Sequence, residues 1–123
     1  MKILIIEDED VLAKVLKEKL EKAKFTVKIS SDGDEAVLDI KNWKPNAILL
    51  DLMLPKKGGL EVLKEIKGDN SLKNIPVIIT SNLGDDESIK KGLQLGAIDY
   101  FVKSEHPINE IIEKVKSAML KGK

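Results

Sequence analysis

Charged side chains follow three of the apolar runs in this sequence. They are Glu7 and Asp8 after the first run, Asp51 at the third and Lys103 after the fifth. Carboxylates that meet repel one another, and their pKa values rise unless a cation joins them. A hard cation such as Mg²⁺ takes oxygen ligands, and a lysine ammonium adds a second positive charge. A carboxylate in that setting can act as a nucleophile and form an acyl phosphate.

Asp51 is the one carboxylate in the run from Ile48 to Pro55. A short apolar run closed by a proline is typical of a strand buried on both faces of a parallel sheet. Asp is rarely fully buried unless it is paired, so Asp51 is expected at the carboxyl end of the strand, where open parallel sheets place their sites. The alternative is an Asp that opens a turn before Pro55.

Strand-like and helix-like segments alternate along the chain. The predicted strands are residues 2–6, 25–29, 47–50, 75–79 and 98–102. The segments between them have apolar residues at helical spacing, with Ser31 or Asp34 as the predicted cap of the second helix and Asp85 or Asp86 as that of the fourth. Short connections and right-handed crossovers then predict an α/β fold with one parallel sheet and helices on both faces.

In such a doubly wound sheet the charged groups converge on one edge, together with Thr80 and Ser81 after the fourth strand. Each residue type also has an ordinary explanation. Acids are favoured at helix amino termini, a strand-end Lys103 can simply be solvated, and Ser81 can serve a turn or a cap. Their joint occurrence at successive strand ends favours a site.

Length and composition exclude several classes of protein. The 123 residues predict one domain over 1–123. The chain has no cysteine, hence no disulfide framework or thiolate metal site. The apolar runs are too short for a membrane span or a signal peptide, which predicts a cytoplasmic protein with no membrane association.

The charges are balanced, with 21 basic and 21 acidic residues. A net charge of zero argues against a dedicated nucleic-acid binder, which carries a basic face. Every basic residue is lysine, so the chain lacks the bidentate fork that arginine offers to phosphate. Any phosphate must therefore be bound by lysine, backbone N–H groups or a metal.

Over its whole length the chain resembles the receiver domains of two-component response regulators, and the single-domain chemotaxis regulators in particular. Each matching feature is weak alone, but their order and spacing are specific. They are Glu7-Asp8, Asp51-Leu52-Met53-Leu54-Pro55 with Gly59, Ser81, Gly96-Ala97 with Tyr100, and Lys103. The resemblance implies a flavodoxin-like, doubly wound sheet of five parallel strands in the order 2-1-3-4-5, with five helices.

The resemblance also implies a role for each matching residue. Asp51 would accept a phosphoryl group from a histidine kinase, a phosphotransfer protein or a small phosphodonor. Asp8, Asp51 and the backbone carbonyl of Met53 would bind Mg²⁺ directly, with Glu7 acting through a water molecule. Lys103 would pair with the carboxylate and then with a phosphoryl oxygen. The domain would catalyse only its own phosphorylation and dephosphorylation.

Signalling in this family implies a switch. Ser81 would hydrogen-bond the phosphoryl group, and Tyr100 would move inward into the vacated space. The distance to Lys103 and the position of Gly84 favour Ser81 over the adjacent Thr80. The movement would change the face formed by the fourth helix, fifth strand and fifth helix. A downstream protein is expected to bind there, since the sequence has no room for an output domain.

Two features qualify the resemblance. The family usually has proline after the strand-end lysine, but here Ser104 follows Lys103. Either a non-proline cis bond is kept, at a cost of about 3 kcal/mol, or the bond is trans and we expect a rearranged loop over 103–106.

The other feature is Asn82, where the family prefers a small residue beside the phosphate and where we expect a narrower entrance and slower phosphate exchange. In addition, Met53 and Leu83 flank the expected path of hydrolytic water. Two apolar groups there predict a long-lived phosphoryl state.

Two other functions compete with a phosphorylated receiver domain. A haloacid dehalogenase-like phosphatase would explain Asp8-Glu9-Asp10-Val11 after the first strand, although the chain lacks a cap domain and a late acidic pair. Turnover of a phosphomonoester would support it. A receiver-like interaction module that is never phosphorylated is the second alternative, which Ser104 keeps open.

Overall fold

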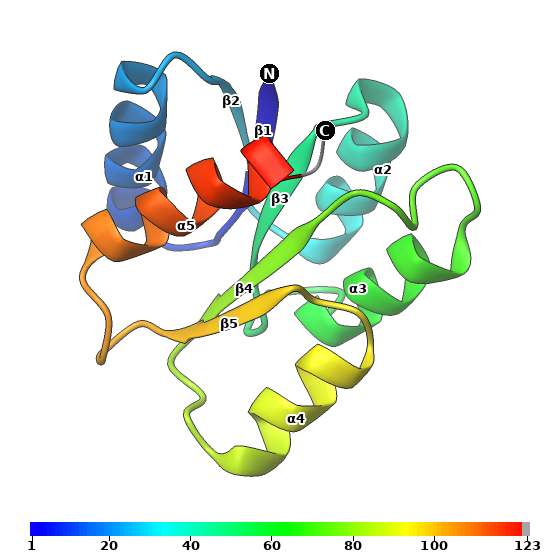
Figure 1. Cartoon of the computed structure of the whole chain (residues 1–123). Helices are drawn as coiled ribbons and strands as arrows, with labels where there is room; N and C mark the ends of the chain where they lie inside the picture. Colours follow the sequence, from blue (N-terminus) through cyan, green and yellow to red (C-terminus); the bar gives the residue numbers. More distant parts are fainter. Residues whose placement is uncertain (122–123) are drawn as a thin grey trace.

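Five parallel strands alternate with five helices in the computed structural model, which describes residues 1–121 (Figure 1). The strands are β1 (Lys2–Ile6), β2 (Thr26–Ser30), β3 (Ala47–Asp51), β4 (Val77–Ser81) and β5 (Asp99–Val102). The helices are α1 (Asp10–Lys22), α2 (Gly33–Trp43), α3 (Gly59–Gly68), α4 (Asp86–Gln94) and α5 (Ile108–Lys121). Residues 122–123 of the expected domain lie outside the described residues.

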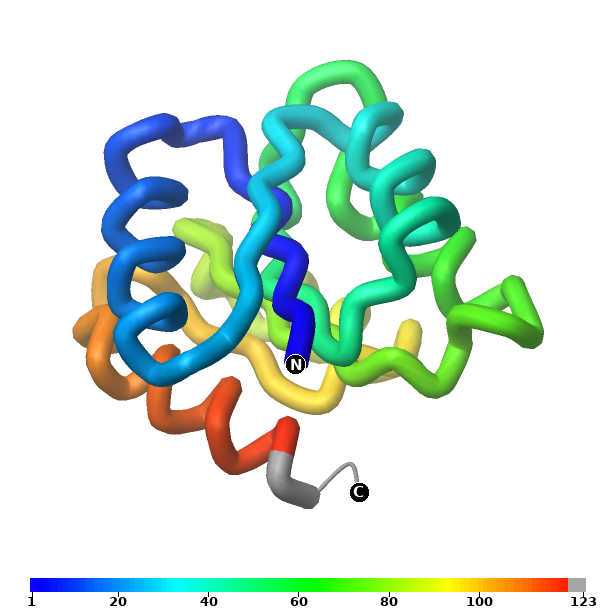
Figure 2. Tube along the Cα trace, turned by 90° about the horizontal axis from the view of Figure 1, so that it is seen from above, coloured from blue at the N-terminus to red at the C-terminus, as the bar shows by residue number. Residues whose placement is uncertain are grey.

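The strands lie in the order β2-β1-β3-β4-β5, so the predicted order 2-1-3-4-5 is confirmed. Figures 1 and 2 show helices on both sides of the twisted sheet. The crossovers place α1 and α5 on one face and the other three helices on the opposite face. No helix within residues 1–121 is both long enough and apolar enough to cross a membrane.

Alternate residues of each strand supply two separate cores. Leu4 and Ile6 belong to the cluster beneath α2 and α3, whereas Ile3 and Ile5 belong to the cluster beneath α1 and α5. Successive strand residues point to opposite faces. A sheet covered on both faces therefore needs apolar residues at nearly every strand position, which explains the unbroken apolar runs in the sequence.

Helix α4 is the least anchored of these helices. Gly92 is its one buried residue, whereas three or more residues are buried in each of α1, α2 and α3. A side chain at Gly92 would meet the sheet directly, because its Cβ would lie 2.6 Å from Cδ1 of Ile79 and 3.3 Å from Cδ2 of Tyr100. The missing side chain lets α4 approach β4 and β5 closely.

The strand register places the charged residues at one edge. Ile6 pairs with Leu50, so the residues that follow them, Glu7 and Asp51, lie side by side at the carboxyl ends of β1 and β3. On the next strands Asp51 pairs with Thr80 and Ser81 pairs with Val102. Lys103 follows Val102 and therefore reaches the same edge.

Some predicted boundaries were wrong by one or two residues. Strand β4 begins at Val77 rather than at residue 75, because Ile75 closes a turn by donating its N–H to the Leu72 carbonyl and Pro76 has no N–H. The cap of α2 is Asp32, not Ser31 or Asp34. Its side chain accepts the Glu35 N–H at 2.8 Å.

Candidate functional site

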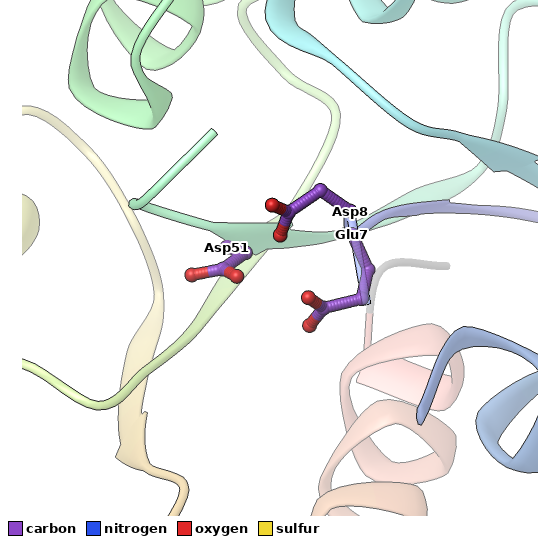
Figure 3. A group of neighbouring side chains, drawn as sticks. All are labelled: Glu7, Asp8 and Asp51. Atoms are coloured by element: carbon purple, nitrogen blue, oxygen red, sulfur yellow. The ribbon is translucent and has the colours of Figure 1, made fainter. Parts of the chain in front are cut away.

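Three carboxylates meet at the carboxyl edge of the sheet (Figure 3). Glu7 and Asp51 are 2% and 4% exposed, while Asp8 is exposed. One carboxylate oxygen from each residue lies within 4.8 Å of the other two. The structure therefore brings together the acidic side chains that the sequence singled out.

A single ammonium joins the two buried carboxylates. Nζ of Lys103 lies 2.7 Å from Oε1 of Glu7 and 3.0 Å from Oδ2 of Asp51, and its side chain is 13% exposed. Buried charges are tolerated when they are paired and hydrogen-bonded. With Asp8 counted, three acids still face one base, so the site holds an excess of negative charge.

Backbone N–H groups orient both buried carboxylates. Oδ1 of Asp51, the carboxylate oxygen that is not paired with Lys103, accepts the N–H of Met53 at 3.1 Å. The second oxygen of Glu7, Oε2, accepts the N–H of Glu9 at 3.2 Å. Each carboxylate is thus held at one oxygen by Lys103 and at the other by the loop that follows its strand.

Burial and excess charge shift the pKa values of this site. Burial raises the pKa of Glu7 from 4.5 to about 7; the negative charge of Asp51 adds to the rise, and the hydrogen bond from Lys103 opposes it. Burial alone would lower the pKa of Lys103, but its hydrogen bonds to Glu7 and Asp51 outweigh that effect and raise it. Lys103 therefore stays charged, while Glu7 readily takes up a proton.

The donor set fits a hard divalent cation. All three side chains offer carboxylate oxygen, which suits Mg²⁺ and similar ions. A cation among Glu7, Asp8 and Asp51 would neutralise their excess negative charge, including the charge of Asp51 that adds to the effect of burial on the pKa of Glu7. The acidic pocket is thus one that could bind a metal ion.

Ser81 and Tyr100 both hydrogen-bond to the backbone of Leu83. Oγ of Ser81 accepts the Leu83 N–H at 3.1 Å, and the Tyr100 hydroxyl donates to the Leu83 carbonyl oxygen at 2.6 Å. Tyr100 is 8% exposed, so it already occupies the inward position. Any change in that position on phosphorylation stays a prediction. No pattern in the sequence predicts that Leu83 links the two residues.

The side chain of the neighbouring residue, Thr80, lies on the opposite face of the sheet from that of Ser81. Thr80 lines a cavity of about 50 Å³ between α1 and α5, together with Leu12 and Ile111. Ser81, one position further along β4, is fully buried. The alternation of strand residues therefore separates the two hydroxyls.

The peptide bond between Lys103 and Ser104 is trans, as are all peptide bonds in the part of the chain that the structure describes. The Lys103 N–H donates to the Ser81 carbonyl at 2.8 Å, and a turn follows in which the Glu105 N–H donates to Val102. Of the two alternatives, the chain takes the trans bond, and Lys103 still reaches both carboxylates.

A parallel sheet of this order defines the doubly wound, flavodoxin-like class, and in this chain three acids and a lysine lie at its carboxyl edge. Within that class, the family model described as response regulator receiver domain matches residues 3–116. The chain belongs to this family. Because the chain belongs to the receiver-domain family, it is not a haloacid dehalogenase-like phosphatase.

Known relatives agree with this assignment. The alkaline phosphatase synthesis transcriptional regulatory protein PhoP of Bacillus subtilis is 34% identical over 118 residues, which are 96% of this chain and 48% of PhoP. The receiver domain of Francisella response regulator 1452 matches with a TM-score of 0.92 and 32% identity, covering 99% of this chain and 98% of that one. The Mn²⁺-bound form of response regulator Rcp1 matches with a TM-score of 0.83 and 30% identity, covering 94% and 91%.

The curated relatives are longer proteins. The chain spans about half the length of those it matches, from 45% to 51%. Their regulatory activities as whole proteins are therefore not established for this chain, and the family assignment concerns the receiver domain alone.

Glu7 predicts a pH dependence of stability for the metal-free protein. Because its pKa is about 7 when folded and 4.5 ordinarily, the folded state holds a proton that the unfolded state releases in between. The free energy of unfolding should therefore fall as pH rises from about 4.5 to about 7, by at most about 1.4 kcal/mol per pH unit. Urea denaturation in a chelator, compared with Glu7→Gln, measures this contribution. Equal slopes in both proteins would contradict it.

The absence of a side chain at Gly92 is expected to control how deeply Tyr100 is buried. Burial raises the pKa of Tyr100 above 10.0, and the chain has one tyrosine, so its ionisation is measurable by ultraviolet absorbance. Gly92→Leu should push α4 away from β5, expose the ring and lower the pKa of Tyr100 towards 10.0. The matched control is Gly68→Leu, since a Cβ at Gly68 meets nothing within 4 Å. A Tyr100 pKa unchanged by Gly92→Leu would refute the prediction.

Proposed function

We propose that this receiver domain carries a phosphoryl group on Asp51, loaded in a Mg²⁺-dependent reaction. One observation supports the proposal above the others. Lys103 contacts Asp51 within a cluster of three acids that offers oxygen ligands to a divalent ion. The metal set would be Asp8, Asp51 and the Met53 carbonyl, with Glu7 acting through a water molecule, as the family resemblance implies.

In the proposed reaction an oxygen of Asp51 attacks the phosphorus in line with the leaving group. The bond from phosphorus to the donor's nitrogen or oxygen breaks as the new bond to Asp51 forms, and the leaving group departs with the bonding electrons. Catalysis of this kind consists mostly of positioning and charge neutralisation. Mg²⁺ supplies a Lewis acid for the phosphoryl oxygens. Lys103 moves from its pairing with the carboxylate to a phosphoryl oxygen, and the Met53 N–H holds the acceptor's orientation.

The donor would be a histidine kinase, a phosphotransfer protein or a small phosphodonor. The recipient of the signal would be a downstream protein that binds the face formed by α4, β5 and α5. The names of two proteins similar to this chain, PhoP of Bacillus subtilis and PhoB of Escherichia coli, describe transcriptional regulators. The receiver part itself has no excess of basic residues, so nucleic acid is not among its proposed partners. A cytoplasmic location fits these partners.

The proposed switch runs through Leu83. A phosphoryl group adds nearly two negative charges and strong acceptor oxygens. The Ser81 hydroxyl now accepts from the Leu83 N–H and would turn to donate to the phosphoryl group. That turn of the side chain would leave the Leu83 N–H without the Ser81 oxygen, while the Leu83 carbonyl would still accept from the Tyr100 hydroxyl. The loop before α4 would shift, and Tyr100 with it.

A direct test is incubation with acetyl phosphate, with Mg²⁺ or with a chelator, followed by intact mass measurement. The expected result is a gain of one phosphoryl group that requires Mg²⁺ and is absent in Asp51→Asn. Asp10→Asn, an exposed acid just beyond the site, is the matched control and should still be phosphorylated. If the wild-type protein gains no mass in Mg²⁺, the unphosphorylated interaction module is the better description.

The lifetime of the phosphoryl group gives a second test. Met53 and Leu83 are 59% and 38% exposed, and neither side chain orients a water molecule well. Leu83→Gln would supply an amide that can position the attacking water, as glutamine does in other phosphoryl-transfer sites. Dephosphorylation, followed by loss of mass over time, should become several-fold faster. Leu93→Gln changes a similarly exposed leucine, 43% exposed, in α4 and should leave the rate unchanged. Equal rates in the two variants would count against the prediction.

A further inference from the structure

The start of α2 packs directly on the loop that follows β3. The Gly33 N–H donates to the Pro55 carbonyl oxygen at 3.3 Å. A Cβ at Gly33 would lie only 1.9 Å from the carbonyl oxygen of Lys57 and 2.6 Å from its Cβ. Because a contact with a backbone oxygen at 1.9 Å cannot be relieved by a side-chain rotation, only glycine allows this approach.

Asp32 reinforces the same contact. Its Oδ1 accepts the Glu35 N–H at 2.8 Å and so caps α2, while its Oδ2 lies 3.6 Å from Nζ of Lys56. Lys56 has a φ of 68°, a conformation that costs a non-glycine residue about 1 kcal/mol. The loop is therefore held in a strained form that α2 contacts on both sides of the strained residue.

The loop is also tied to Asp51 at its beginning and end. Met53 donates its N–H to Oδ1 of Asp51 at 3.1 Å. The Gly59 N–H donates to the Leu52 carbonyl at 3.0 Å, and a Cβ at Gly59 would lie 2.4 Å from the Asp51 carbonyl oxygen. Because the loop is held at both ends, a displacement at Pro55 is expected to move the Met53 N–H that orients the carboxylate.

We infer that Gly33 is a positioning residue for Asp51 and for its metal, and the inference rests on the function proposed above. Gly33 and Asp32 hold residues 55–57, those residues hold Met53, and Met53 orients Asp51. Neither Gly33 nor Asp32 touches the carboxylate. Residues that orient the ligands of a metal typically change its affinity 10–100-fold when they are replaced.

The test replaces Gly33 with alanine and uses Gly58→Ala as its control. Gly58 belongs to the same loop, but a Cβ there meets nothing within 4 Å. Calorimetric titration with Mg²⁺ and no phosphodonor should show at least tenfold weaker binding in Gly33→Ala and unchanged binding in Gly58→Ala. Equal Mg²⁺ affinity in Gly33→Ala and the wild type would overturn the inference. Wild-type protein that binds no Mg²⁺ would instead remove the proposed function.

A second readout needs no metal. The Met53 amide, whose hydrogen bond to Asp51 is the last link of the chain, should exchange with solvent deuterium several-fold faster in Gly33→Ala than in the wild type. Its exchange in Gly58→Ala should not change. Unchanged Met53 exchange in a folded Gly33→Ala protein would overturn the inference, whatever the metal affinity.

Asp32→Asn covers the case in which Gly33→Ala does not fold. Asparagine caps helices about as well as aspartate, so α2 should keep its start while the charge facing Lys56 is lost. Mg²⁺ binding two- to threefold weaker, with faster Met53 exchange, is the expected result. Wild-type values for both quantities in Asp32→Asn would overturn the inference.

Discussion

One ammonium shared by two buried carboxylates is the constraint on which this structure depends. Nζ of Lys103 lies within 3.0 Å of both Glu7 and Asp51, and Asp8 adds a third negative charge nearby. The three carboxylates carry more negative charge than the one ammonium can neutralise. A proton on Glu7 or a divalent cation would each reduce this excess. The same imbalance costs stability and would favour a cation bound at this edge of the sheet.

The sheet supplies the precision of this arrangement. Glu7 and Lys103 are 96 positions apart in the sequence, yet only the order of the strands and their register are needed to bring them together. A one-residue slip of β3 would turn Asp51 to the other face and bury a neighbouring leucine in its place. The apolar residues of both cores therefore fix the site as firmly as the charged residues do.

The sequence allowed the fold, the acidic cluster and Lys103 to be predicted because each leaves a side-chain signal. Strand-length apolar runs identify the sheet, and charges directly after them identify its functional edge. The contacts of Leu83 left no such signal, since they use its backbone N–H and carbonyl. The approach of Gly33 to Lys57 was missed for a related reason: a glycine in a turn does not say which backbone it approaches. Asp32 was missed as a cap because two neighbouring residues of capping type compete with it.

The energies at Leu83 would allow the proposed phosphoryl group to act on a surface that it does not touch. A neutral hydrogen bond such as that between Leu83 and Ser81 contributes about 1 kcal/mol, whereas a bond to a charged group contributes about 1.5–3 kcal/mol. A phosphoryl group within reach of Ser81 would accept the hydroxyl's own hydrogen, and turning the side chain towards it would cost only the weaker bond in which Oγ accepts the Leu83 N–H. Helix α4 presents little resistance, because Gly92 is its one buried residue. The difference of about 0.5–2 kcal/mol is modest, but it would act on the loop that leads into the helix with the fewest buried residues.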